Sequence, residues 1–345
     1  MVCLEGGNFL NLLFLSGLFL LLMSGVQMNS VFFLWMLMEF VFFFVVMLMI
    51  KGSKGEVNLS GIIFYLFVQA LGGVLLLCSV MVEMLYFGNY YYFGSSICLG
   101  CLYLGVAGVV LKMGMFPFYL QVYQIMSFIS FDQIALFMLY PKVVPGILLY
   151  NMLGQLEMGE GVLVLPMMVI MLSGFQGLKS SDLREFLAWS GLGQLGWIFL
   201  SILGSFMTFV YFFFLYSFVL FYVCKTMGKS GKKIFYNFSG VGGSLKGIYN
   251  ILLGVFFMSG LAPFLMFYLK LFLLFNLSSF FVKGVALILL LSMGMFLFYV
   301  RALQMGVSVG NSYYESSPNE VVGLGGYGGF LLFLFFCSGG VLFLI

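Results

Sequence analysis

Histidine is absent from the 345 residues of this chain, and charged side chains are scarce. Lys, Arg, Asp and Glu make up 7% of the sequence, whereas soluble domains carry about 25%. Without imidazole ligands, the chain cannot hold haem or copper as cytochromes b and haem–copper oxidases do. So few charges cannot cover a water-soluble globule of this size. This excludes soluble enzymes, nucleic-acid-binding proteins and disulfide-rich secreted folds.

Apolar residues are correspondingly abundant. They make up 63% of the sequence, and the mean hydropathy is +1.19, as expected for a membrane-embedded chain. Most of the six cysteines fall within apolar runs. Cys98 and Cys101 have the spacing of a metal-binding pair, but no second pair lies nearby. We therefore interpret the cysteines as small buried thiols, and we expect no metal site.

Long apolar runs predict an all-α polytopic membrane protein with about eleven transmembrane helices. A single integral membrane domain is expected over residues 1–345. The first apolar run lacks the basic flank and cleavage site of a signal peptide, so we expect it to remain as a span. The expected spans are 9–26, 31–50, 59–86, 96–126, 131–153, 161–178, 183–203, 205–224, 248–275, 281–302 and 326–345.

Two of the expected spans contain a glycine and a proline near their middle. One of them, 96–126, would reach ~46 Å as a straight helix, well beyond the ~30 Å hydrocarbon core. Proline interrupts a helix, and the two local sequences match, since 114–118 reads GMFPF and 260–264 reads GLAPF. Two such broken helices predict an inverted repeat with a polar pathway at the middle of the membrane. Its pseudo-symmetric halves would cover roughly 31–153 and 161–302, with terminal helices added.

The distribution of basic residues predicts the orientation of the chain. With eleven spans, ten of the 14 lysines and arginines lie on the side of the N-terminus, and three lie inside spans. Only Lys283 lies on the opposite side. With an even number of spans, the basic residues would no longer gather on one side of the membrane. By the positive-inside rule, the N-terminus is predicted on the cytoplasmic or matrix side.

Four ionisable residues interrupt the apolar spans: Glu39, Lys112, Lys142 and Lys270. Each charge at the bilayer centre costs roughly 2.5–3.5 kcal/mol, so these groups should face one another or water. A buried lysine can both take and give a proton, because desolvation disfavours its charged form. Movement of a nearby carboxylate would switch the proton on such a lysine. The four residues therefore predict a proton-transfer axis.

The segments around these residues resemble a known family. Their order and spacing, from Glu39 to Arg301, are similar to those of the subunit 2 family of mitochondrial respiratory complex I, NADH:ubiquinone oxidoreductase. That family belongs to the antiporter-like subunits. The matching stretches are Lys112-Met-Gly-Met-Phe-Pro117-Phe118, Lys142 before Pro145, Ala188-Trp189-Ser190 with Leu195-Gly196-Trp197, and Gly260-Leu-Ala-Pro263 with Lys270.

The resemblance implies roles for the four ionisable residues. Glu39 and Lys112 would form an ion pair between helices, Lys142 would be the central proton carrier and Lys270 the distal one. A lysine at the distal position favours subunit 2 over the related subunit 4. Members of the family often carry histidine in the segments equivalent to Tyr119 and Gln194. This chain has none, so a relay there would use water, hydroxyls and amides.

The resemblance also implies a place in an assembly. The chain would translocate protons as a core membrane-arm subunit of the H⁺-translocating NADH:ubiquinone reductase, in the mitochondrial inner membrane with its N-terminus in the matrix. It would carry no cofactor or redox chemistry of its own, because other subunits handle NADH, FMN, iron–sulfur clusters and ubiquinone. Its partners would be other membrane-arm and accessory subunits and membrane lipids, with no nucleic acid.

Two other functions remain open from the residues alone. A free-standing secondary cation/proton antiporter would have similar broken helices, although such antiporters usually have further spans. A purely structural membrane scaffold would also be apolar and helical. In a scaffold, replacing Lys142 with methionine should leave proton pumping intact.

Overall fold

The computed structural model describes residues 30–52, 59–87, 99–154, 160–230, 245–260, 264–278 and 281–316, together with Gly17 and Gly25. The expected span 326–345 lies outside the described residues, as does 9–26 apart from those two glycines. Residues 231–244 lie outside them as well. Every element within the described ranges is helical. An all-helical membrane fold is thus confirmed, while the count of eleven spans stays a prediction.

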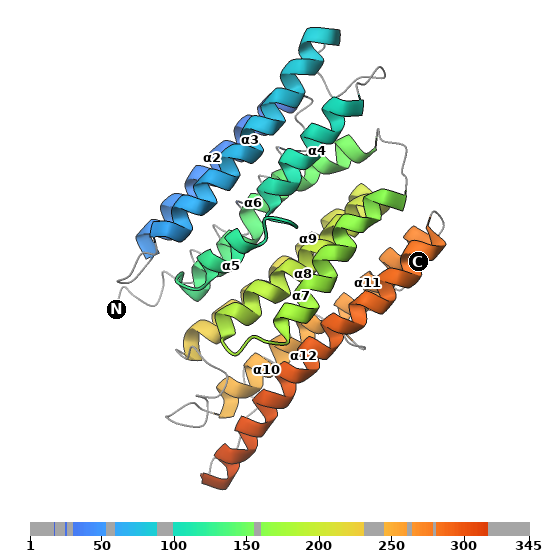
Figure 1. The fold of residues 1–345 in the computed structure, drawn as a ribbon. Helices are drawn as coiled ribbons and strands as arrows, with labels where there is room; N and C mark the ends of the chain where they lie inside the picture. Colours follow the sequence, from blue (N-terminus) through green and yellow to red (C-terminus); the bar gives the residue numbers. More distant parts are fainter. Residues whose placement is uncertain are drawn as a thin grey trace. The chain divides into compact units, whose positions relative to one another are not determined.

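The chain divides into two compact units, of which the first comprises residues 1–129 and 136–159. Its longest helix, α3, packs along α4 and also contacts α2 and α5. Each of these helices buries apolar side chains against its neighbours. The unit contains α2 (Val31–Gly52), α3 (Leu59–Phe87), α4 (Leu99–Met113), α5 (Leu120–Met126) and most of α6 (Phe131–Leu153) (Figure 1).

The second unit comprises residues 130–135 and 160–345. Its centre is α8, in which every residue from Phe186 to Leu203 is buried. Helices α7, α9 and α11 contact α8, and α12 packs along α7 and α10. The elements are η1 (Glu160–Leu163), α7 (Val164–Gly177), α8 (Leu183–Gly204), α9 (Phe206–Ser230), α10 (Leu245–Ser259), α11 (Leu265–Ser278) and α12 (Val282–Ser316).

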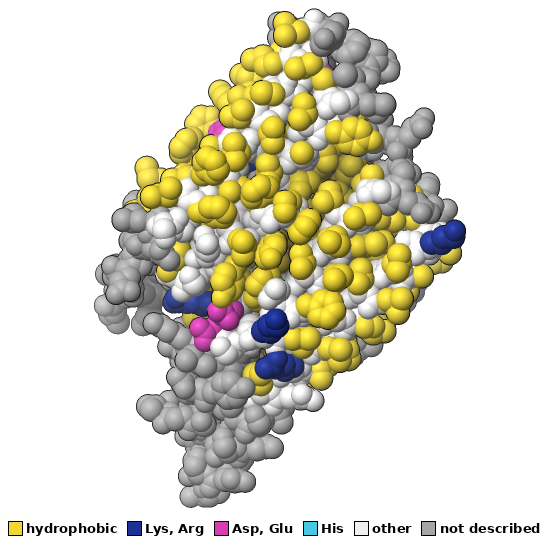
Figure 2. Space-filling view, viewed as in Figure 1, with side chains coloured by type: hydrophobic (Ala, Val, Ile, Leu, Met, Phe, Trp, Pro, Cys, Tyr) yellow, Lys and Arg dark blue, Asp and Glu magenta, His cyan; other side chains and the backbone are white. Residues whose placement is uncertain are grey.

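Helix length and composition are those of a membrane protein. Among the described residues, five helices are long and apolar enough to cross a membrane: Ser60–Leu85, Phe131–Leu153, Leu183–Gly204, Phe206–Gly228 and Val282–Met305. Shorter apolar helices accompany them. Hydrophobic side chains cover most of the described surface in the view of Figure 2, and charged side chains occupy only small patches. Helix α12 runs to Ser316, beyond the expected end at 302, because its last residues continue as a more polar helix.

Both predicted helix breaks are present. Helix α4 ends at Met113, and α10 ends at Ser259. In each case the residue that follows the helix is a glycine in the left-handed region, with φ of 72° at Gly114 and 69° at Gly260. Only glycine adopts this conformation without steric cost, so it ends a helix readily. At α4 the backbone N–H groups of Gly114 and Met115 bond back to the helix, as in a Schellman motif.

Candidate proton-transfer site

The ion pair expected between Glu39 and Lys112 is formed in the first unit. Glu39 lies midway along α2, and Lys112 lies in the last turn of α4. The Lys112 Nζ is 2.5 Å from Glu39 Oε1, and the two side chains are 3% and 23% exposed. Burial makes an unpaired charge costly, so each residue supplies the partner that the other needs.

A pair of glycines on α3 makes room for this ion pair. A Cβ atom added at Gly73 would lie 2.6 Å from Glu39 Oε1 and 3.5 Å from Lys112 Nζ. One added at the preceding Gly72 would lie 2.9 Å from Lys112 Cγ. Such distances are too short for a side chain, so the close approach of α3 depends on glycine here.

Two glutamine amides satisfy carbonyl groups at the broken end of α4. The last carbonyls of a helix have no partner within it. Gln69 Nε2 on α3 donates to the Lys112 carbonyl at 3.0 Å, and Gln121 Nε2 on α5 donates to the Leu111 carbonyl at 3.2 Å. Both glutamine side chains are fully or almost fully buried. The backbone of Lys112 is thereby held in place beside the ion pair.

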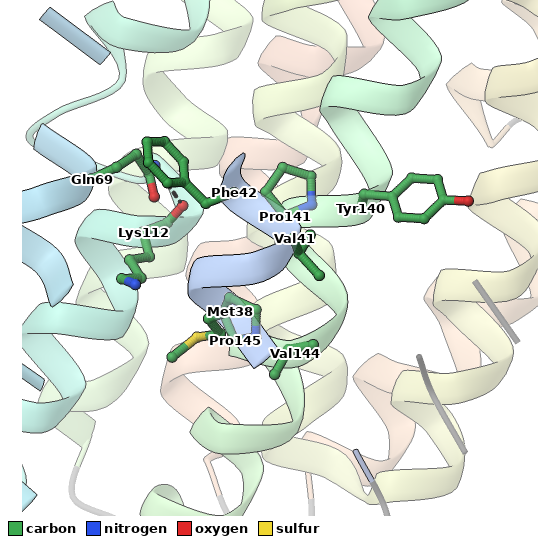
Figure 3. Close-up of a pocket in the computed structure, with 9 residues that line it drawn as sticks. All are labelled: Met38, Val41, Phe42, Gln69, Lys112, Tyr140, Pro141, Val144 and Pro145. Carbon is green, nitrogen blue, oxygen red and sulfur yellow. Dashed lines mark hydrogen bonds between the residues drawn. The ribbon is translucent and has the colours of Figure 1, made fainter. Parts of the chain in front are cut away.

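A small cavity adjoins this end of α4 (Figure 3). The volume that the centre of a water molecule can occupy in this cavity is about 10 Å³. This volume is at the lower limit for holding one water molecule. Pro141 and Pro145 lack backbone N–H groups, so the carbonyls of Phe137 and Pro141 lose their usual helical donor. These carbonyls can accept hydrogen bonds from water. The cavity is lined by Met38, Val41, Phe42, Gln69, Lys112, Tyr140, Pro141, Val144 and Pro145.

Lys142 lies on α6 between the two prolines and is only 3% exposed. Its Nζ is 3.1 Å from the Met138 sulfur, a weak acceptor one helical turn away. Within the described residues it forms no ion pair, unlike Lys112. The amine therefore has no strong partner that would fix its protonation state. This is the environment expected of a group that exchanges protons.

Lys270 is held at the second broken helix. Its Nζ on α11 donates to the Ser259 carbonyl at 3.3 Å, at the C-terminal end of α10. The same Nζ lies 5.1 Å from the centre of the Trp197 ring on α8. The negative end of a helix dipole and an aromatic face both stabilise a cation. The α10 terminus therefore provides a cation-binding site without a carboxylate.

The two breaks are stabilised in the same way. Gln194 Nε2 on α8 donates to the Met258 carbonyl at 2.9 Å. Met258 precedes Gly260 by two residues, as Lys112 precedes Gly114. In each unit, one buried glutamine from a neighbouring helix therefore holds the carbonyl two residues before the left-handed glycine. A second donor comes from the helix after the break, Gln121 in one unit and Lys270 in the other.

The structure thus brings Glu39 and Lys112 together and places Lys142 in the same unit, while Lys270 belongs to the second unit. The roles of these four residues stay predictions. Sequence reasoning named Gln194 only as the site of a possible amide relay, and it missed Gln69, Gln121 and the Gly72–Gly73 pair, because uncharged residues are common in membrane helices and give no distinct signal. Over the described ranges, no three Cys, Asp or Glu side chains are grouped as metal ligands would be.

Known proteins resemble the chain in sequence. No protein-family profile matches it. NADH-ubiquinone oxidoreductase chain 2 of Locusta migratoria is 24% identical over 223 residues, 64% of this chain and 63% of that protein. The protein of the same name from the shrew Sylvisorex ollula is 25% identical over 134 residues, 39% of this chain and 38% of that protein. Each match therefore spans less than two thirds of the relative.

Solved structures share the fold. A chain of respiratory complex I from Thermus thermophilus with bound NADH has a TM-score of 0.70 at 15% identity, covering 86% of this chain and 72% of that one. A chain of the Mrp complex from Dietzia sp. DQ12-45-1b has a TM-score of 0.72 at 15% identity, covering 84% and 59%. A chain of an archaeal membrane-bound sulfane sulfur reductase has a TM-score of 0.74 at 16% identity, covering 94% of this chain and 71% of that one. The chain is therefore similar in sequence to NADH-ubiquinone oxidoreductase chain 2, and it shares its fold with chains of these membrane complexes.

Proposed function

We propose that this chain is a proton-translocating membrane-arm subunit of respiratory complex I in the mitochondrial inner membrane, with its N-terminus in the matrix. The observation that carries the proposal is the buried Glu39–Lys112 ion pair at the end of an interrupted helix. Ionisable groups are retained inside a membrane at considerable cost, and they typically mark an ion or proton pathway. The names of the sequence relatives support the choice of complex I.

The ion pair can act as an electrostatic switch. Two unit charges ~7 Å apart interact by about 2–5 kcal/mol at an effective dielectric of about 10–20. At the 2.5 Å contact between Glu39 Oε1 and Lys112 Nζ the attraction is stronger still, and it holds the proton on the amine. If Glu39 moves away, the attraction weakens and Lys112 can release its proton. A small helix displacement would therefore be converted into proton transfer.

Lys142 and Lys270 extend the switch to the rest of the chain. A proton released from Lys112 would be taken up by Lys142, which has only a weak sulfur partner. Lys270 would receive or release the distal proton at the C-terminal end of α10. Half-helix ends of this kind bind coupling ions and protons in transporters, because their carbonyls are free to coordinate. The pseudo-symmetric pair of left-handed glycines supports the division into two halves at about 31–153 and 161–302.

Redox chemistry would lie outside this chain. We assign NADH, FMN, the iron–sulfur clusters and ubiquinone to other subunits, so the chain would act as part of the H⁺-translocating NADH:ubiquinone reductase without a cofactor of its own. Energy would reach it through neighbouring membrane-arm subunits. Exposed apolar side chains on α2, such as Phe40 and Met47, would contact those subunits or lipid.

A native gel tests the proposal directly. Inner membranes solubilised in mild detergent are separated, stained for NADH-dehydrogenase activity, and analysed for peptides of this chain. We expect the chain only in the large NADH-oxidising band. Its presence in a small band without that activity would overturn the proposal and would favour a free-standing cation/proton antiporter.

A further inference from the structure

Helices α7 and α12 of the second unit run in parallel and touch closely. A Cβ atom added at Gly174 of α7 would lie 2.9 Å from the backbone of Gly294 in α12. One added at Gly284, near the start of α12, would meet the side chain of Leu163, directly before α7. The paired residue numbers rise together, so the two helices point in the same direction. We call the line of contact between them the α7–α12 seam.

Two basic side chains lie at the end of the seam. Gly177 lies against the Phe298 ring, which an added Cβ would approach to 2.8 Å. Lys179 follows Gly177 by two residues and Arg301 follows Phe298 by three, so both lie within about one turn, ~5 Å along the axis, of this contact. Both side chains are exposed. In Figure 2, basic side chains gather beside hydrophobic ones over this end of α7 and α12.

Neither cation is neutralised by the protein within the described ranges. No carboxylate there lies within ion-pair distance of Lys179 or Arg301, including that of Asp182, three positions after Lys179. The two expected spans outside the described residues, 9–26 and 326–345, contain no Asp or Glu that could pair with them. The pair of positive charges therefore requires an anion from another molecule.

These cations lie at the level expected for the membrane surface. The apolar stretch of α12 that could cross a membrane ends at Met305, and the shorter one that includes α7 ends at Gly177. Lys179 comes just after the second stretch, and Arg301 lies about one turn before the end of the first. Long basic side chains at such positions extend to the lipid headgroups. The positive-inside rule predicts both residues on the matrix side.

Exposed apolar side chains flank the seam on the membrane side of the two cations. On α7, Met171 and Phe175 are one turn apart and are 36% and 60% exposed. On α12, Leu290 and Leu297 are 69% and 56% exposed, and they share a helix face with Arg301 at spacings of seven and four residues. The α12 span is also the least buried of the five described spans, at 28%.

Between these side chains the seam is open at Gly294. A Cβ atom added there would meet nothing within 4 Å, although the backbone of Gly294 touches Gly174. Open space bordered by exposed apolar side chains allows an acyl chain to make many dispersion contacts. The seam therefore combines an apolar surface for a hydrocarbon chain with two cations at its headgroup end.

We propose that the α7–α12 seam binds an anionic phospholipid, with its phosphate groups on Lys179 and Arg301 and an acyl chain over Gly294. Basic sites between membrane helices on the matrix side suit such headgroups. Arginine binds a phosphate through parallel N–H···O bonds, and lysine acts as a point charge. A lipid with two phosphates, such as cardiolipin, matches the two cations. The site goes beyond the proposed function and does not depend on it.

The test uses the intact assembly that contains this chain, in phosphatidylcholine nanodiscs with a photoactivatable cardiolipin whose reactive group is on an acyl chain. We expect cross-links to peptides around Phe175 and Leu297, displaced by unlabelled cardiolipin. The double variant of Lys179→Gln and Arg301→Gln should need about thirtyfold more cardiolipin for half-maximal labelling, and each single variant about fivefold more. Each basic residue near anionic lipid contributes about 1 kcal/mol, which corresponds to these ratios.

Three further variants separate a seated lipid from general charge attraction. Gly294→Leu keeps both cations but fills the open space, so it should weaken labelling. Lys283→Gln is the matched control, because Lys283 is exposed near the start of the same helix. Lys225→Gln removes an exposed charge of α9 on the same predicted side of the membrane. Neither control should change labelling.

Several outcomes would overturn the lipid site. Equal displacement by phosphatidylcholine, or unchanged labelling in the double variant, would show that the cations do not select an anionic lipid. A density map of the intact assembly with residues 326–345 or another subunit over the seam would do the same. A native gel shows whether each variant assembles. Proton pumping is not the readout, so failure of the lipid site leaves the proposed function standing.

Discussion

Gln69 donates its side-chain amide to the backbone carbonyl of Lys112, the same lysine whose ammonium is paired with Glu39. One buried glutamine on α3 thereby fixes the backbone beneath the proposed switch. At the second break, Gln194 has the same relation to Met258. The ends of the interrupted helices are therefore held by side chains from neighbouring helices, and movement of those helices would be transmitted to the lysines.

Removing the Gln69 amide should loosen the backbone at the switch. Gln69→Met keeps the length of the side chain but leaves the Lys112 carbonyl without a donor, at a cost of about 1–3 kcal/mol. We expect a lower kcat for ubiquinone reduction with an unchanged KM, together with a lower melting temperature of the complex. Gln124→Met is the control, because Gln124 on α5 is exposed. Equal effects of the two substitutions would contradict the assigned role.

Adding a methyl group at Gly73 should separate the ion pair. The new Cβ would lie 2.6 Å from Glu39 Oε1, so either the carboxylate or α3 must move. We expect Gly73→Ala to reduce proton pumping by about tenfold or more, since even an increase to ~7 Å removes much of the attraction. In Gly100→Ala the added Cβ meets nothing within 4 Å, and pumping should be unaffected. Normal pumping by Gly73→Ala would show that the close approach is not needed.

Most of the fold could be predicted from the sequence because the apolar runs are long and uninterrupted. The run at 131–153 coincides with α6, and both breaks follow from a glycine and a proline within an overlong span. The end of α12 could not be predicted, because a polar helical extension has no hydropathy signal. The terminal spans lie outside the described residues.

The site could be predicted only in part. Charges within apolar spans stand out, so Glu39 and the three lysines were identifiable. Gln69, Gln121 and Gly73 were not, because uncharged residues are common in membrane helices. Their importance depends on which helix faces are in contact, which a single sequence does not reveal. The pairing of Glu39 with Lys112 came from the resemblance rather than from spacing.

The charges of Glu39 and Lys112 should act as one functional unit. Glu39→Gln keeps the shape and an acceptor oxygen but removes the charge that holds the proton on Lys112. We expect Glu39→Gln, Lys112→Met and the double variant to lower coupled NADH oxidation to a similar extent. A double-mutant cycle measures this, because residues in direct contact give strongly non-additive effects. Additive losses would indicate that the two residues act independently.

Lys142 is the residue on which the account depends most directly. The decisive measurement is proton uptake per NADH oxidised by the intact complex in sealed vesicles, with Lys142→Met compared with the wild type. Lys283→Met is the control, because Lys283 is exposed on α12. With normal assembly, we expect pumping and coupled turnover at least about tenfold lower in Lys142→Met and unchanged in Lys283→Met. If the Lys142→Met complex pumps protons as the wild type does, the lysine is not a proton carrier and the chain acts as a structural scaffold.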